Sequence, residues 1–321
     1  MIAAPDTYTP ITLKRVFDTK KVSPLLAFSN VASQRKVIDE NIGKISISGV
    51  QEKLSVIIDH EKIILTPEGV QGTHIIKAAP DYKRLKNRNQ LPANEHLTMQ
   101  IAQQVYGLSV AENAMVFFRN GEAAYITKRF DIDKNKCKIK QEDFASLSQK
   151  TKETDGDNFK YTGDYVTAGQ LIKQFVAAWQ IETVKYFRLI VFNYLFANGD
   201  AHLKNFSLQQ TTTGDYLLTP AYDLLNTSLH VNDEDFALSG GLFDKQHCSE
   251  IYLQTSHPCQ EDFMTFGTLL EIPKVVINKT LNKFTTPQGL VTELTERSFL
   301  NEQLKRMYLR SYQERLSRLQ R

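Results

Sequence analysis

The sequence predicts an α+β fold in which a small β-rich lobe precedes a larger helical lobe. Short β-prone apolar runs fill the stretch from Ser46 to Asp131, and longer helix-period patterns begin after about residue 140. No repeat or low-complexity linker separates the two parts. We therefore predict a β-rich lobe over residues 1–130 and a helical lobe over residues 131–321, with the boundary in KRFD, residues 128–131.

Composition places the chain among ordinary globular proteins. Of its 321 residues, 41% are hydrophobic and 23% are charged, and the formal net charge of +3 is too small to indicate nucleic-acid or membrane binding by itself. The first residues lack the apolar core of a signal peptide, and no segment approaches the roughly 18 apolar residues of a membrane span. Three widely spaced cysteines provide neither a disulfide framework nor a CxxC site. We expect a cytoplasmic protein.

Five apolar runs are typical of strands in the β-rich lobe. They are LSVII (54–58), KIILT (62–66), THIIKA (73–78), AMVFF (114–118) and AAYITKRF (123–130). A single helix is predicted over residues 94–107, where apolar residues recur at helical spacing and a glycine ends the pattern.

The second lobe is predicted to contain helices over residues 168–180, 182–198 and 298–319, with a hairpin that begins at residue 207. The last helix is rich in arginine, which could indicate a nucleic-acid or partner surface. We favour an amphipathic helix that packs on the lobe and turns a basic face to solvent.

A polar cluster follows the apolar helix 182–198. In GDAHLKNFSL, Asp200 and Asn205 stand five residues apart, and Asp223 follows in YDLLNT. Phosphoryl transfer from a nucleoside triphosphate uses one carboxylate near the acceptor hydroxyl, and an amide oxygen with a second carboxylate to hold Mg²⁺. Each residue alone could serve in a cap or turn. Together they favour phosphoryl-transfer chemistry.

Two lysines could hold phosphate beside this cluster. Lys77 lies in the apolar run THIIKAAP, where a buried ammonium requires a partner such as Glu95 or a nucleotide phosphate. It could instead face solvent on an edge strand. Gly49 in SISGVQEK could expose backbone amides to an anion beside Lys53, although no GxxxxGK[ST] or GxGxxG pattern occurs.

The histidines outside the cluster show no metal-ligand spacing such as HExxH, so we expect surface or supporting roles for them. They are His60, His74, His96, His230, His247 and His257.

The strings SISGVQEKLS, THIIKAAP, NEHL, YITKRFD, NGDAHLKNFSL and YDLLNT, in this order, resemble the HipA family of bacterial serine/threonine kinase toxins. The resemblance runs from about residue 44 to the C-terminus. It implies a bilobal protein-kinase-like fold with ATP and Mg²⁺ in the cleft between the lobes. Position by position, Asp200 resembles the catalytic aspartate, and Asn205 and Asp223 resemble the Mg²⁺ ligands.

The same resemblance implies a set of nucleotide contacts. Some relatives carry an acidic residue where this chain has Lys128, so adenine contacts in this hinge are expected through the backbone. The implied cofactor-binding residues are Lys53, Lys77, Gly49, His202, Tyr222, Arg129 and Phe130.

The resemblance is to the short HipT type, because longer members carry an additional subdomain before the phosphate loop and only 45 residues precede Ser46 here. It implies a HipBST-like toxin-antitoxin module with a HipS-like small antitoxin and a HipB-like DNA-binding antitoxin. It also implies an aminoacyl-tRNA synthetase as the protein substrate, whose phosphorylation would inhibit translation. A small-molecule or lipid kinase and a binding-only pseudokinase remain open alternatives.

The resemblance further suggests autophosphorylation at Ser46 or Ser48. The SIS spacing places both hydroxyls on one side of an extended chain. A phosphate there adds about −1.5 to −2 charges next to the phosphate loop, so we expect it to lower ATP affinity. The serines could instead make a polar turn. An ATP titration of the phosphorylated protein against a Ser46→Ala, Ser48→Ala variant distinguishes these interpretations.

Overall fold

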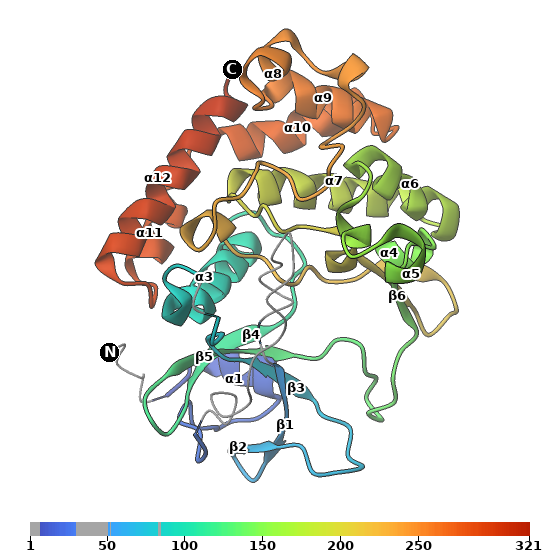
Figure 1. The fold of residues 1–321 in the computed structure, drawn as a ribbon. Helices are drawn as coiled ribbons and strands as arrows, with labels where there is room; N and C mark the ends of the chain where they lie inside the picture. Colours follow the sequence, from blue (N-terminus) through green and yellow to red (C-terminus); the bar gives the residue numbers. More distant parts are fainter. Residues whose placement is uncertain (1–6, 30–50, 52, 83–84) are drawn as a thin grey trace.

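The structure is a computed structural model that describes residues 7–29, 51, 53–82 and 85–321. A five-stranded antiparallel sheet forms the smaller lobe at the bottom of Figure 1, and a helical lobe lies above it. The strands lie in the order β2-β1-β3-β5-β4. Their bounds are β1 Lys53–Asp59, β2 Lys62–Leu65, β3 His74–Lys77, β4 Asn113–Phe117 and β5 Ala123–Lys128.

The sheet separates two apolar clusters because side chains alternate between its faces. On one face, Ile76, Val116 and Ile126 pack with helix α1 (Pro10–Phe17), which begins at a Thr9 cap. On the other face, Tyr125 joins the core that includes helix α3 (Leu91–Gln104). The same alternation directs Ile75 and Lys77 of β3 toward the space between the lobes.

The helical lobe is built around the long buried helix α7 (Trp179–Leu195), against which α6, α10 and α12 pack. Its core continues into α3, so both lobes share that helix. The remaining helices are α4 Phe144–Leu147, α5 Lys152–Asp155, α6 Tyr165–Phe175, α8 Glu250–Thr255, α9 Gln260–Leu269, α10 Lys274–Thr285, α11 Gly289–Glu296 and α12 Glu302–Leu319.

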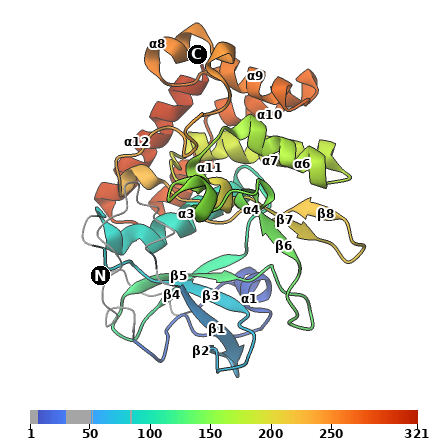
Figure 2. The same cartoon turned by 45° about the vertical axis from the view of Figure 1, so that its right-hand side comes forward.

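A second, three-stranded antiparallel sheet lies at the side of the helical lobe that faces the smaller lobe (Figure 2). Its order is β6-β7-β8, with β6 Gln141–Asp143, β7 Ser207–Gln210 and β8 Tyr216–Leu218. Short 3-10 turns connect the larger elements, at η2 Arg88–Gln90, η3 Phe159–Tyr161, η4 Leu203–Asn205, η5 Thr227–Leu229 and η6 Lys245–His247.

The strand predictions and the hairpin are confirmed to within two residues. The prediction of one continuous helix over residues 168–180 is wrong, because α6 ends at Phe175 and Val176 is extended before α7 begins. The helix predicted over residues 94–107 lies three residues earlier, with Pro92 in its first turn. The helix α1 and the strand β6 were not predicted.

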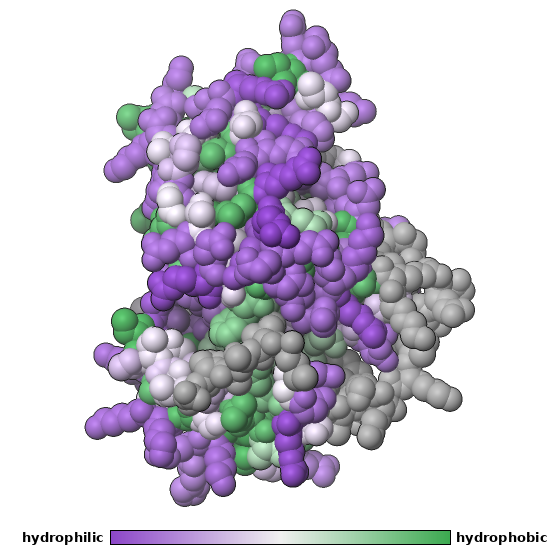
Figure 3. All heavy atoms as spheres, turned by 90° about the vertical axis from the view of Figure 1, so that its left-hand side faces the viewer, coloured by the Kyte–Doolittle hydropathy of each residue, from purple (hydrophilic) through white to green (hydrophobic). Residues whose placement is uncertain are grey.

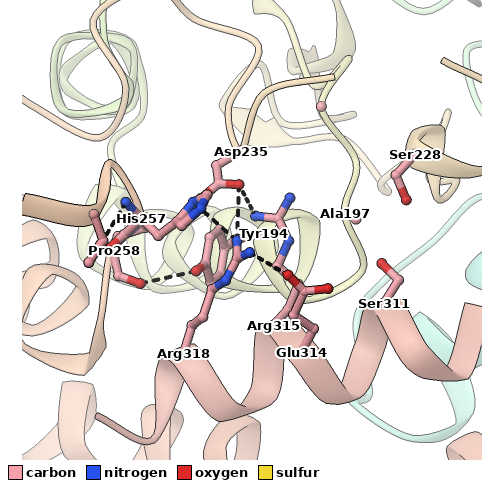
Figure 4. Close-up of polar contacts among 12 residues, drawn as sticks. Tyr194, Ala197, Ser228, Asp235, His257, Pro258, Ser311, Glu314, Arg315 and Arg318 are labelled. Carbon is pink, nitrogen blue, oxygen red and sulfur yellow. Dashed lines mark hydrogen bonds and ion pairs between the residues drawn. The ribbon is translucent and has the colours of Figure 1, made fainter. Parts of the chain in front are cut away.

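A polar cluster fastens α12 to the loop that precedes α8 (Figure 4). Arg315 and Arg318 of α12 both reach the carboxylate of Asp235, whose other oxygen contacts His257 Nδ1 at 2.8 Å. The guanidinium of Arg315 also lies over the Tyr194 ring, 4.9 Å from its centroid. The prediction of a solvated basic face is therefore wrong for Arg315, which is 9% exposed.

Within the residues that the structure describes, no helix has the length and apolar character that crossing a bilayer requires. No group of three or more His, Cys, Asp or Glu side chains with metal-binding geometry occurs in that part of the chain either. On the face shown in Figure 3, hydrophilic side chains dominate the helical lobe, and apolar side chains gather over the smaller lobe.

Candidate active site

A cleft with a cavity volume of about 530 Å³ lies between the small sheet and the helical lobe. The sheet contributes Ile75 and Lys77 from β3 and the chain around Arg129, and the helical lobe contributes its two candidate metal ligands. The lining residues with polar side chains include Lys53, Lys77, Glu95, Asp143, Lys160, His202, Lys204, Asn205, Ser207, Tyr222 and Asp223.

Lys77 lies at the centre of an ion-pair group at one side of the cleft. Its Nζ donates to Glu95 Oε1 at 2.5 Å and also to Asp223 Oδ1. Lys77 is 6% exposed. Burial alone would lower the pKa of Lys77, but the Asp223 and Glu95 carboxylates outweigh it and raise that pKa above its ordinary value. Lys77 therefore stays charged, and the solvent-facing alternative for it is wrong.

Asp223 and Asn205 meet in the same corner. The Asn205 side-chain amide donates to Asp223 Oδ2 at 3.3 Å, and its Oδ1 accepts from the His202 backbone at 3.0 Å. Asp223 has a φ of 56°, in the left-handed region that non-glycine residues rarely adopt. Asn198 donates to the Asp223 carbonyl at 3.3 Å and so supports this backbone conformation.

Asp200 lies five residues after the end of α7, in a closely packed part of the chain. It is 9% exposed, and its Oδ1 accepts from the hydroxyl of Tyr161 at 2.8 Å. The preceding Gly199 allows close approach, because a Cβ there would lie 2.6 Å from the Cβ of Asp233. Thr227 Oγ1 accepts from the Gly199 backbone N–H at 2.8 Å. These contacts fix the backbone that carries Asp200.

His202 lines the cleft and is buried with its ring edge against Tyr161, at 5.2 Å between ring centroids. Burial lowers the pKa of His202 to about 3, with the neighbouring Lys160 acting in the same direction. His202 is therefore neutral at physiological pH and can serve as a hydrogen-bonding group without adding charge.

The wall near the hinge combines aromatic and polar groups. The rings of Phe130 and Tyr222 lie 5.7 Å apart between centroids at an angle of 33°. Tyr222 donates to the Lys204 carbonyl at 2.9 Å, and its hydroxyl oxygen lies 2.7 Å from Ser207 Oγ. Arg129 pairs with Asp131. Such a flat, partly apolar wall suits a planar ring system.

Comparison with known proteins shows the family to which this chain belongs. The family model of the HipA-like C-terminal domain matches residues 45–286, well over half of the chain. The chain belongs to the HipA-like family. A candidate kinase of Haemophilus influenzae is 28% identical to this HipA-like chain over 334 residues, covering 97% of this chain and 92% of that protein.

The serine/threonine-protein kinase toxin HipA of Shewanella oneidensis is 27% identical over 207 residues. That alignment covers 60% of this HipA-like chain but only 45% of the toxin, so the chain spans less than half the length of this relative.

Two solved structures show the same fold. A complex of HipA, HipB and operator DNA from Shewanella oneidensis MR-1 matches with a TM-score of 0.62 at 21% identity, covering 87% of this chain and 65% of the matched chain. The Helicobacter pylori proinflammatory kinase CtkA matches with a TM-score of 0.52 at 15% identity, covering 82% and 93%. The α+β bilobal, kinase-like fold is thereby confirmed.

Several residues singled out in the sequence of this HipA-like chain come together in the cleft. Lys53, Lys77, Arg129, Phe130, His202, Asn205, Tyr222 and Asp223 all line it. Asp200 does not line the cavity but lies beside it through Tyr161 and His202. Ser46, Ser48 and Gly49 lie outside the described residues.

Sequence reasoning missed two lysines of the cleft, Lys160 and Lys204. Lys204 belongs to the GDAHLKN string and could have been found there, and its Nζ lies 4.0 Å from Asp143 Oδ2. Lys160 belongs to the short turn η3, which carries no motif. Of the histidines for which we expected surface or supporting roles, His74 and His230 are buried, and each contacts a backbone carbonyl of another segment.

Asn205 and Asp223 fit a divalent cation of the Mg²⁺ type. One amide and one carboxylate supply oxygen ligands, which Mg²⁺ prefers, and Mg²⁺ commonly takes its remaining ligands from water and substrate phosphates. The excess negative charge around Lys77 fits this as well, because two carboxylates share one ammonium there.

Proposed function

We propose that this chain is an ATP- and Mg²⁺-dependent serine/threonine protein kinase that acts as the toxin of a HipBST-like toxin-antitoxin module. The observation that carries the proposal is the convergence of Lys77, Asn205 and Asp223 in one cleft, with Asp200 beside it. Membership of the HipA-like family and the kinase-like fold support it.

Each group has a task in this proposal. Lys77, held by Glu95, pairs with phosphate oxygens, and Lys53, which lies directly opposite Lys77 in the pairing of β1 with β3, adds charge. Asn205 and Asp223 would hold Mg²⁺, which would supply neutralisation of the charge on the phosphates. Asp200 accepts the proton of the acceptor hydroxyl.

The remaining nucleotide contacts follow from the lining of the cleft. Tyr222 and Phe130 form the aromatic wall for the adenine, Arg129 belongs to the hinge, and neutral His202 offers a hydrogen bond to the nucleotide. Gly49 would belong to the phosphate loop.

The proposed substrate is an aminoacyl-tRNA synthetase, and the proposed partners are a HipB-like DNA-binding antitoxin and a HipS-like small antitoxin. The partner proposal draws support from the structural relative, which is a complex of HipA with HipB and operator DNA. Ser46 and Ser48 remain the proposed autophosphorylation sites.

The test measures incorporation of radiolabelled γ-phosphate by the purified protein, followed by phosphosite mapping in cells that express it. We expect one dominant new phosphoserine on a synthetase, with an Asp200→Asn variant reduced to background. A wild-type protein that transfers no phosphate would refute the kinase proposal. Transfer to a metabolite or lipid without any protein phosphosite would replace the protein substrate with a small-molecule one.

A further inference from the structure

The turn η3 brings two side chains to the candidate active site from a segment that contains none of the family strings. The turn lies against η4 of the catalytic loop. Its position is fixed by hydrogen bonds on both sides, since the Tyr161 N–H donates to the Asn158 carbonyl and the Ser239 N–H donates to the Tyr161 carbonyl, both at 2.8 Å.

Tyr161 touches the residue assigned to proton transfer. Its hydroxyl donates to Asp200 Oδ1 at 2.8 Å in a buried setting, and its ring packs edge-on against His202. This donor on Oδ1 orients the carboxylate of Asp200. The donor also favours the charged form of Asp200, which is the form that accepts a proton.

Lys160, the preceding residue, is one of the residues that line the cleft. It is half-buried and lines the cavity with Lys77 and Asn205, and its Nζ lies 5.1 Å from the centroid of the Tyr161 ring. Burial lowers the pKa of Lys160, and the nearby Asp200 acts in the opposite direction. Among the described residues Lys160 forms no ion pair, so an anion that enters the cleft would compensate the cost of burying its charge.

The other lysines of the cleft differ from Lys160. Lys77 already holds two carboxylates, and the half-exposed Lys204 lies within ion-pair distance of Asp143. Lys53 belongs to the small lobe, at the start of β1. Lys160 therefore combines attachment to the catalytic loop with an ammonium that forms no ion pair with the described carboxylates.

We propose that Lys160 contacts the phosphoryl group during transfer and that Tyr161 positions Asp200 for it. This inference deepens the proposed kinase function and rests on it. In the step, a bond forms between the acceptor oxygen and the γ-phosphorus while the bond from that phosphorus to the bridging oxygen of ADP breaks. The electron pair leaves with ADP, and the acceptor proton passes to Asp200. The Lys160 ammonium stabilises the negative charge on the equatorial phosphoryl oxygens.

The first test replaces Lys160. Lys160→Met is expected to lower the single-turnover rate of γ-phosphate transfer on the order of 10²-fold, as removal of a preorganised charge does, while the Kd for ATP changes less than about threefold. Lys160→Arg is expected to recover part of the rate because it keeps the charge. Lys152→Met, which removes an exposed lysine of the same segment, is the matched control and should retain the wild-type rate.

The second test replaces Tyr161 with Phe and records the pH dependence of the transfer rate. The acid limb is expected to move to higher pH, because Asp200 loses a donor that favours its charged form. If Tyr161 only supports the fold, Tyr161→Phe will lower the melting temperature and leave the acid limb of the transfer rate at its wild-type pH. That result would overturn the positioning role.

Failure of this inference can be distinguished from failure of the proposed function. The role of Lys160 alone is overturned if Lys160→Met transfers phosphate at the wild-type rate. It is also overturned if the transfer rate of this variant falls only as far as its affinity for ATP. A wild-type protein with no more transfer than Asp200→Asn overturns the kinase function and this inference with it.

Discussion

Lys77 connects the two lobes through ion pairs. It belongs to the small sheet, its partner Glu95 to α3, and its other partner Asp223 to the helical lobe. Two carboxylates contact this one ammonium in a buried place, and Lys53 adds positive charge near Glu95. The group is therefore sensitive to removal of Lys77.

Lys77→Met is predicted to lower the free energy of unfolding by about 3–5 kcal/mol near pH 8, because it leaves two buried carboxylates without their cation. Burial already raises the pKa of Glu95 to about 7 against the opposing effect of Lys77, so the variant raises that pKa further. A raised carboxyl pKa costs stability as pH rises above the unfolded value, so the loss should be smaller at pH 5.5.

Urea unfolding of the wild type and Lys77→Met at both pH values checks this prediction. The double variant Lys77→Met, Glu95→Gln is the control, and it should recover much of the loss because only one carboxylate remains. An equal loss at pH 5.5 and pH 8 would contradict the electrostatic explanation.

At the scale of elements, α3 connects the candidate metal corner to the sheet. The Asn94 side chain pairs with both backbone groups of Asn226, donating to its carbonyl at 2.8 Å and accepting from its N–H at 3.1 Å. Asn94 Nδ2 also lies 2.9 Å from His230 Nε2. Because Glu95 follows Asn94 and Asp223 precedes Asn226 by three residues, this pairing sets the distance between the two carboxylates that hold Lys77.

Asn94→Leu is predicted to destabilise the protein by about 2–4 kcal/mol, because the Asn226 N–H and C=O would both remain buried without partners. The same variant should weaken ATP binding by displacing α3. Gln104→Leu, an exposed substitution on the same helix, should change stability by less than about 0.5 kcal/mol. Denaturant midpoints and ATP titrations measure both effects, and an unchanged midpoint for Asn94→Leu would refute the prediction.

The sequence predicts helices and strands well where the spacing of apolar residues matches the positions whose side chains are buried. The five strands were found because β-prone apolar runs mark them, even though their two faces belong to different cores. The break between α6 and α7 was missed because Val176 is buried and continues the apolar pattern, and only its extended backbone ends the helix. The strand β6 is polar, so its pairing with β7 decides its conformation.

The residues of the candidate site also divide into those that the sequence predicts and those that only the structure shows. Asp200, Asn205 and Asp223 could be predicted because they belong to the sequence strings GDAHLKNFSL and YDLLNT. Glu95 was also predicted from the sequence, as a candidate partner for Lys77. The contact between Lys77 and Asp223 joins residues 146 positions apart, which no local pattern predicts. Tyr161 and Lys160 lie in a three-residue turn, and only tertiary packing brings them to Asp200.

At the scale of the whole molecule, buried histidines make folding sensitive to acid. Burial lowers the pKa of His74, His202 and His230 below the ordinary value of 6.5, in the case of His202 to about 3. The unfolded chain binds protons below pH 6.5 that the folded chain does not, so stability falls as pH decreases from about 6.5. For His202, whose folded pKa is about 3, this loss is about 1.4 kcal/mol one pH unit below the ordinary value.

The difference in unfolding free energy between pH 7.5 and pH 5.5 is predicted to contain this loss from the histidines, against an opposing gain from Glu95, whose raised pKa costs stability at the higher pH. His74→Gln should reduce this difference, because Gln can still donate to the Val16 carbonyl and does not titrate. His247→Gln, at an exposed position, should leave the difference unchanged. If His74→Gln changes this difference no more than His247→Gln does, His74 takes up a proton in the folded state and the prediction is wrong.

The polar cluster on α12 imposes an order of assembly. Asp235 is held by Arg315 and Arg318, and the segment just before it packs against Gly199, next to Asp200. A growing chain that has not yet exposed residue 318 to solvent lacks those guanidinium groups. At synthesis rates of about 5–20 residues per second, the small sheet has time to form first. We therefore expect a nascent chain whose α12 has not yet left the ribosome to carry an unfinished catalytic loop, so that phosphate transfer begins only after α12 has emerged and packed.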